Sequence, residues 1–119
     1  MATLRIVRPE DRAIPPEGQT PGLRRETAVA QEGVWIGVVH TDPGVGGWHH
    51  HSENDTYVYM LDGVMRIEQR DGRAAIEGKR DDFLLIPKKT VHREITPEGE
   101  HASAIIIRVG SGPAVVSLE

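Results

Sequence analysis

Four histidines of this chain have a spacing that could bind a metal ion. Three are consecutive, His49, His50 and His51, and His92 follows Pro87 in a later segment. In an extended segment successive side chains point to opposite faces, so His49 and His51 would share one face. Two such imidazoles and a third from a neighbouring strand make a facial set of nitrogen donors. Neutral imidazole is the commonest protein ligand for divalent transition metals, so the pattern indicates a metal site.

Composition limits what such a site could contain and where the protein would act. The 119 residues include no cysteine, which excludes disulfides and thiolate ligands and leaves only nitrogen and oxygen donors. This length fits one domain. The formal net charge of −4, with scattered Lys and Arg, argues against a nucleic acid or an anionic membrane as partner. Because no signal-like or membrane-spanning apolar run is present, we expect a cytoplasmic protein.

The elements that must position these histidines read as β-strands. Apolar runs are short, rich in Val and Ile, bounded by turn residues, and recur roughly every 8–12 residues. No segment shows a sustained helical period. The expected strands are residues 4–7, 34–40, 48–51, 56–61, 64–69, 74–77, 83–86, 91–95, 104–109 and 114–116, and residues 23–30 are either extended or a short helix. We expect a turn at Asp62-Gly63 and a type I′ hairpin turn at residues 70–73.

These strands predict an all-β fold, a single antiparallel jelly-roll β-barrel covering residues 1–119. Residues 1–33 would form an N-terminal arm and edge strands, and residues 34–116 the barrel core. Such a barrel leaves two sheet edges and a free N-terminal segment, so we expect a homodimer, with N-terminal strand exchange as one arrangement.

Two stretches resemble the motifs of the cupin superfamily. Residues 47–63 resemble the first motif, His-x-His, three or four residues, Glu, six residues, Gly. Residues 81–96 resemble the second, Gly, five residues, Pro, x, Gly, two residues, His, three residues, Asn. The matching residues are His49, His51, Gly63, Pro87 and His92. The resemblance implies a small single-domain cupin with a metal held by His49, His51 and His92, and the consecutive histidines resemble a variant subgroup of that family.

The chain departs from both motifs at four positions. Thr56 stands where the first motif has its Glu, and Thr96 where the second has its Asn. Asp81 and Lys89 stand where the second motif has glycines. Because Thr56 is neutral, the family's carboxylate ligand does not carry over.

Several groups remain open as the fourth ligand: Asp55, Glu53, Glu94 or water. Asp55 and Glu53 follow the histidines, with a solvated loop or a strand cap as the alternative. Glu94 would share a face with His92, and a buried carboxylate is costly unless it is paired or metal-bound. We name Glu94 as a candidate catalytic base, hydrogen-bond partner or ligand, with a salt bridge to an arginine such as Arg108 as the alternative.

A substrate pocket would be lined by the residues nearest the ligands. Thr56, Val58 and Met60 share one strand face, and Trp48 directly precedes the histidines. The alternatives are a core or interface position for Trp48 and a core position for Met60, and Phe83 is also expected in the core. Arg24 and Arg25 are expected to be solvated, and an anion-binding role for either would require the N-terminal arm to fold over the barrel mouth.

Three imidazoles without thiolate suit Fe, Mn, Ni, Zn or Cu. Such a divalent ion acts as a Lewis acid or activates a water. We therefore expect a metal-dependent enzyme on a small polar or aromatic molecule. Oxygenase-type chemistry comes first, ahead of isomerase or decarboxylase chemistry. The alternative is a carrier or sensor of a metal or small ligand, since a fold does not dictate a function.

Overall fold

The computed structural model describes residues 3–15 and 22–118, and the predicted all-β fold is confirmed. Its helical element is one 3-10 turn, η1 (Pro9–Asp11). The strands are β1 (Leu23–Gln31), β2 (Val34–Thr41), β3 (Gly44–Val45), β4 (His49–His50), β5 (Asp55–Gln69), β6 (Ile76–Lys79), β7 (Phe83–Ile86), β8 (His92–Thr96), β9 (Ala102–Val109) and β10 (Val116–Ser117). Within these described residues, no helix is both long and apolar enough to cross a membrane.

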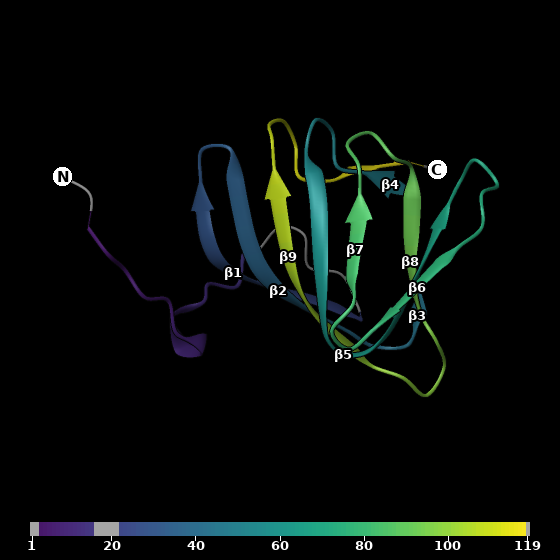
Figure 1. Cartoon of the computed structure of the whole chain (residues 1–119), viewed down its shortest axis with the longest axis horizontal. Helices are drawn as coiled ribbons and strands as arrows, with labels where there is room; N and C mark the ends of the chain where they lie inside the picture. The colour runs from purple at the N-terminus through teal and green to yellow at the C-terminus, as the bar shows by residue number, and fades with distance from the viewer. Residues whose placement is uncertain (1–2, 16–21, 119) are drawn as a thin grey trace.

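The strands form one antiparallel sheet that curls on itself, as Figure 1 shows. The path runs β1-β2-β9-β5-β8-β4-β10, while β3 pairs with β8, and β6 and β7 pair with β5. The first part of β5 pairs with β9 and β7, and its last part pairs with β6 and β8. Strand β5 therefore joins the two halves of the sheet, and the curl turns β4 and β8 toward the inward face of β9.

The turn predicted at Asp62-Gly63 is wrong, because β5 continues through it. The pairing of β5 with β9 shifts register between Met60 and Asp62, which marks a bulge. Gly63 has φ +77, and a Cβ there would collide with the backbone carbonyl of His101. A bulge at a glycine increases the local twist of a strand and bends it without ending it. The close approach of β9 therefore explains why glycine occupies this position.

The hairpin between β5 and β6 also differs from the prediction. Gly72 has φ +83, but Asp71 is not among the residues with positive φ. A type I′ turn needs positive φ at both central residues, so this loop is of another type.

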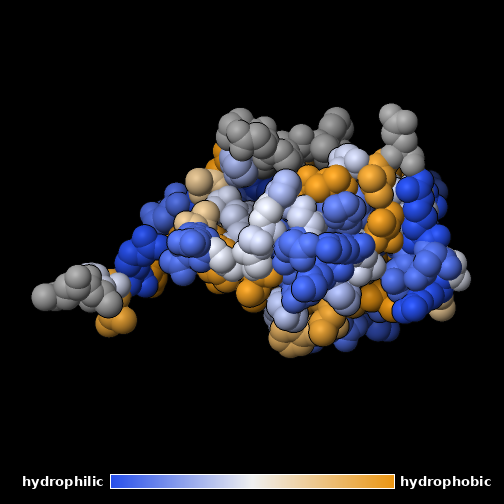
Figure 2. All heavy atoms as spheres, turned by 90° about the horizontal axis from the view of Figure 1, so that it is seen from above, coloured by the Kyte–Doolittle hydropathy of each residue, from blue (hydrophilic) through white to orange (hydrophobic). Residues whose placement is uncertain are grey.

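The N-terminal segment is not a strand at residues 4–7. It approaches the sheet through one isolated bridge, Ala13 to Thr27, and stands away from the body in Figures 1 and 2. Residues 23–30, which the sequence left open, lie in strand β1.

Two non-glycine residues have a left-handed backbone where the second motif has glycine. Asp81 has φ +73 and Lys89 has φ +61. This region favours glycine because a Cβ crowds the carbonyl, and Asp tolerates it better than most residues. The chain therefore keeps the turns of the motif although the glycines are replaced.

The core lies on the inward face of the curled sheet. Alternate residues of β5 point inward, and Thr56, Val58 and Met60 are 2 % exposed or less. Their buried partners include Val39, Leu84, Ile86, Ala104 and Ile106. The core position predicted for Phe83 is wrong: its side chain is on the outer face, 67 % exposed, with its ring 4.8 Å from that of Tyr59.

Candidate metal centre

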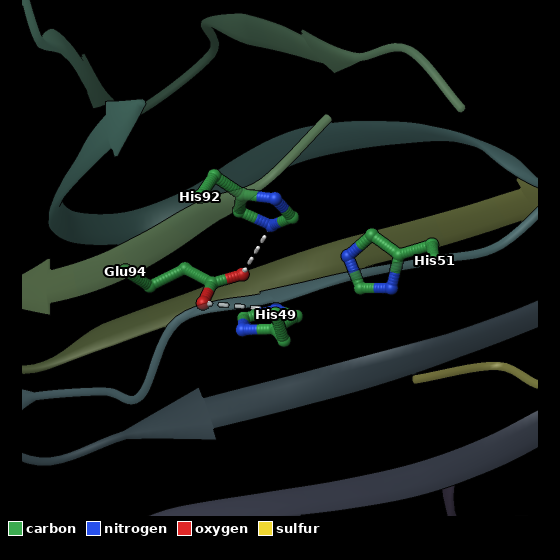
Figure 3. Close-up of side chains that lie close together, drawn as sticks. All are labelled: His49, His51, His92 and Glu94. Carbon is green, nitrogen blue, oxygen red and sulfur yellow. Dashed lines mark ion pairs between the residues drawn. The ribbon is translucent and has the colours of Figure 1, made fainter. Parts of the chain in front are cut away.

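Strands β4 and β8 bring the histidines together. His49 on β4 lies directly opposite His92 on β8, and the ring centroids are 4.3 Å apart. His51 follows β4 and faces both rings, at 5.0 Å from His49 and 4.9 Å from His92. Glu94, two residues after His92, extends between His49 and His92 in Figure 3. One donor atom from each of these four residues lies within 4.8 Å of the other three.

A backbone carbonyl fixes the tautomer of each of the three imidazoles. The Nδ1 atoms of His49, His51 and His92 lie 2.8 Å from the carbonyl oxygens of Gly47, Ala114 and Thr90, respectively. A carbonyl oxygen only accepts hydrogen bonds, so each Nδ1 must donate its proton. In the neutral rings Nε2 is then an unprotonated acceptor, as metal-ligating histidines require.

The carboxylate of Glu94 completes the cluster. Its two oxygens lie 3.4 Å from Nε2 of His49 and 3.4 Å from Nε2 of His92. Burial would raise the pKa of Glu94, but hydrogen bonding and charge interaction with His49 and His92 outweigh it and hold this pKa well below its ordinary value. Glu94 is therefore ionised at neutral pH.

The pKa values of His49 and His51 shift in opposite directions in this environment. Burial lowers the pKa of His49, but hydrogen bonding with Glu94 and its negative charge outweigh burial and raise that pKa overall. For His51 burial dominates, and the pKa falls to about 3. His51 is 3 % exposed and therefore neutral in the folded chain at ordinary pH.

This donor set fits a divalent cation. His92 is fully buried, and its Nε2 has no hydrogen-bond partner of good geometry among the described residues. When the three rings are neutral, three imidazole acceptors and one carboxylate converge without a donor to satisfy them, which is costly in a protein interior. A cation satisfies all four at once, and nitrogen and oxygen donors suit the borderline transition metals.

The other predicted ligand residues lie outside this cluster. Asp55 accepts a hydrogen bond from the backbone N–H of Lys88, 2.9 Å away. Glu53 is exposed and pairs with Lys89 at 2.7 Å. His50 faces away from the cluster, and its Nδ1 accepts a hydrogen bond from the backbone N–H of Ser52.

The cluster lines a small chamber, and a larger pocket shares two arginines with that chamber. A small inner chamber of about 30 Å³ is lined by His51, Glu94, Thr56 and Val58, among others. A larger outer pocket of about 830 Å³ lies at the end of the barrel formed by the β1–β2 hairpin and the segment before β10. Arg25 and Arg108 line both spaces.

Two of the predicted pocket residues lie elsewhere. Met60 is completely buried in the core and lines neither cavity. Trp48 also lines neither, and the guanidinium groups of Arg93 and Arg70 lie over its ring at 4.5 and 5.6 Å. Trp48 lies next to His49, so strand alternation sends its side chain to the opposite face.

Sequence reasoning missed two contributors to this region. Arg108 was considered only as an ion-pair partner of Glu94, and Ala114 was not considered. A signal for Arg108 was present, because it continues the alternation of buried residues Ala102, Ala104 and Ile106 along β9. A charged residue at a position where this alternation places buried residues is expected to point inward. The Ala114 carbonyl has no such signal, because it acts through the backbone.

Comparison with known proteins agrees with this architecture. A family model described as the cupin domain matches residues 37–108, which include all four cluster residues. The uncharacterized protein YdbB of Bacillus subtilis (strain 168) is 46 % identical over 46 residues, 39 % of this chain and 40 % of YdbB. The chain thus matches about two fifths of that relative's length.

Solved structures of low sequence identity share the fold. A cupin-like protein from Thermotoga maritima has a TM-score of 0.76 at 22 % identity, covering 89 % of this chain and 86 % of that one. The polyketide cyclase RemF from Streptomyces resistomycificus has a TM-score of 0.81 at 17 % identity, covering 98 % and 87 %. Likeness at these identities shows the fold alone, and it confirms the barrel type that the motifs implied.

Proposed function

The chain belongs to the cupin domain family, and on this premise we propose that it is a metal-dependent enzyme acting on a small molecule. The proposed ligands are His49, His51, His92 and Glu94. Asp55 is not proposed, because its carboxylate is held by the Lys88 backbone outside the cluster.

The observation that carries the proposal is the common tautomer of the three rings. All three donate Nδ1–H to a carbonyl at 2.8 Å, which leaves three Nε2 lone pairs beside an ionised carboxylate. Hydrogen bonds of this kind orient metal-binding imidazoles and raise their basicity. When the rings are neutral, these four acceptors face one another without a donor, and a bound cation removes that cost.

A bound Fe, Mn, Ni, Zn or Cu ion would supply Lewis-acid chemistry, or oxygen chemistry where the ion is redox-active. We rank oxygenase-type chemistry first, because four protein donors leave two positions free in a six-coordinate sphere. Isomerase and decarboxylase chemistry follow.

The residues around the proposed ligands have distinct roles. The low pKa of Glu94 makes it a stronger candidate for a ligand than for a general base, which works best with a pKa near the operating pH. Thr56 is 2 % exposed, lines the inner chamber with His51, and its Oγ1 has no hydrogen-bond partner among the described residues. We propose that this hydroxyl forms a hydrogen bond with a water or a substrate atom in the chamber.

Metal titration of untagged, chelator-treated protein tests the site. We expect saturable binding of one Fe(II), Mn(II) or Zn(II) per chain by isothermal titration calorimetry. Loss of an outer hydrogen-bond partner alone costs metal affinity about 10–100-fold, so loss of a ligand in His92→Gln should cost more than this. His50→Gln is the matched control, because His50 belongs to the same run and faces away. Equal affinities in the two variants would contradict the ligand assignment.

Oxygen chemistry is tested separately on the loaded protein. Fe(II) is added without oxygen, and oxygen uptake is then followed with a panel of small aromatic and polar molecules. Substrate-dependent uptake that is lost in His92→Gln supports oxygenase chemistry. Conversion without oxygen uptake would move the assignment to isomerase or decarboxylase chemistry.

A second candidate is a non-catalytic carrier or sensor, and the observation that favours it is the size of the inner chamber. About 30 Å³ accommodates roughly one water and no organic substrate in the chamber that His51 and Glu94 line. In that case the metal would bind without accelerating any reaction in the panel, in the absence or presence of oxygen.

A further inference from the structure

Two arginines point into the barrel from opposite sides of β2. Arg25 lies on β1, and Arg108 lies on β9, directly opposite Thr56 of β5. Arg108 is only 6 % exposed, and arginines are almost never that buried without a partner for their charge. Its burial and its closeness to Arg25 lower its pKa to about 10, so it still carries a full positive charge at neutral pH.

The protein does not fully satisfy Arg108 from its own described residues. Its Nε is buried and has no hydrogen-bond partner there. Among the described residues, Glu94 is the carboxylate that acts on Arg108, and it is already engaged by His49 and His92 at 3.4 Å. A guanidinium has five N–H donors in a planar fork that matches a carboxylate, so an unused buried Nε–H points to an absent oxyanion.

The charges around the two cavities favour a further anion. Arg25 and Arg108 repel each other, and Glu94 is the carboxylate that attracts both of them. A divalent metal on the histidines would add positive charge beside these arginines. Glu32, the acidic residue among those lining the outer pocket, is exposed at the β1–β2 hairpin.

The guanidinium of Arg108 is held in place by Trp35 and Gly37. It lies 4.7 Å above the indole ring of Trp35, its neighbour across the β2–β9 pair. A Cβ on Gly37 would collide with that ring, so glycine there creates the room in which Trp35 lies. Stacking on an aromatic face fixes the plane of an arginine and leaves its edge free for bidentate bonding.

The position of the arginines suggests how a ligand would lie. Both form the boundary between the inner chamber beside His51 and Glu94 and the outer pocket of about 830 Å³. That volume is in the range of small-molecule sites. Its other lining residues include apolar groups, Pro15, Ala30, Val34, Trp35 and Val115. The outer pocket would hold an apolar body, and the arginines would hold a charged end next to the metal site.

We propose that the outer pocket binds a small organic carboxylate, with its carboxylate group on Arg108 and Arg25 and its apolar body against Trp35. The proposal rests on the proposed function for the role of this ligand as substrate, while the binding itself depends on the arginines. It assigns the substrate class as a monocarboxylate with an apolar body.

Binding to chelator-treated protein tests the arginines without the metal, which also attracts carboxylates. The probes are benzoate and phenylacetate, with benzamide as the uncharged isostere of benzoate and phenyl phosphate as the competing oxyanion. We expect saturable binding of the carboxylates by NMR titration or calorimetry. Benzamide should bind at least about 10-fold more weakly, since charge-assisted hydrogen bonds are the stronger ones.

Variants identify the groups responsible. Arg108→Gln should weaken benzoate binding about 10- to 100-fold. Arg108→Lys should restore part of the affinity, because lysine supplies the positive charge but not the planar set of N–H donors. Arg93→Gln is the matched control, because Arg93 pairs with Glu68 at 2.8 Å on the outer face. If Arg108→Gln does not fold, Arg25→Gln on β1 provides the second variant.

The outcomes separate this inference from the proposed function. Carboxylate binding that depends on Arg108 in metal-free protein supports the inference even if no metal binds to the histidines. Equal binding of benzoate and benzamide, tighter binding of phenyl phosphate than of benzoate, or unchanged binding in Arg108→Gln overturns it. Metal binding to the histidines would survive each of those results.

Discussion

The buried neutral His51 should make the stability of the metal-free protein depend on pH in a defined window. Burial lowers the pKa of His51 to about 3 in the folded chain, while an unfolded chain has the ordinary value of 6.5. Between pH 3 and 6.5, His51 is therefore protonated in the unfolded chain and neutral in the folded chain. The folded state is therefore favoured fully above pH 6.5, and this advantage is lost as the pH falls.

The magnitude follows from the proton linkage. One proton of difference changes the free energy of unfolding by about 1.4 kcal/mol per pH unit. Because the unfolded histidine is only half protonated at pH 6.5, His51 alone should cost about 2.3 kcal/mol between pH 6.5 and 4.5. Glu94 and His49 act outside this window. The depressed pKa of Glu94 contributes stability that is lost below its ordinary value of 4.5. The raised pKa of His49 contributes stability that is present below 6.5 and lost as the pH rises further.

Urea unfolding of chelator-treated protein at pH 6.5, 5.5 and 4.5 measures the effect. In His51→Asn the side-chain amide can still donate to the Ala114 carbonyl, but the titrating group is gone, so the slope in this window should fall by about 1.4 kcal/mol per pH unit. His101→Asn is the control, because the side chain of His101 is 74 % exposed. Parallel stability curves for wild type and His51→Asn, within about 0.5 kcal/mol, would refute the reasoning.

Three further predictions follow from the same geometry. Because protons compete with a metal for the imidazoles, metal affinity should fall at least about tenfold from pH 7.5 to 5.5 in calorimetric titrations. The Glu94→Gln variant should bind the metal more weakly at both pH values. A metal affinity that does not depend on pH would exclude imidazole ligands. Lys89→Gly should raise Tm by a few degrees in differential scanning calorimetry, because it relieves a left-handed backbone at φ +61, whereas Lys88→Gly, at a residue without positive φ, should lower it. The exposed apolar side chains Leu4, Phe83 and Leu85 support the predicted homodimer, which native mass spectrometry should detect at micromolar concentration; a strictly monomeric particle would contradict it.

The local pattern of the sequence predicted most of the strands and the arrangement of the histidine run. The alternation of a strand correctly placed His49 and His51 on one side and His50 on the other. It failed at Asp62-Gly63, where two residues typical of a turn lie within β5. The backbone of β9 passes so close to Gly63 that the pair forms a bulge, and that approach comes from residues about forty positions away.

The composition of the candidate site depended on pairings that a sequence pattern does not contain. Glu94 was placed on the same face as His92, but its contact with His49 requires the direct pairing of β4 with β8. An ion pair with Arg108 was the alternative for Glu94, and the carboxylate oxygens lie instead 3.4 Å from Nε2 of His49 and of His92. Long-range register therefore decides which charge lies beside which ligand.

The backbone bond from Ala114 to His51 has a consequence for the end of the chain. The carbonyl that selects the His51 tautomer belongs to the segment leading into β10, and β10 itself pairs with β4. A segment more than sixty residues further along the chain thus fixes the tautomer and orientation of the His51 ring. Proteolytic trimming there would spare all four donors yet release one imidazole to rotate. The orientation of His51 thus depends on residues that supply no ligand atom themselves.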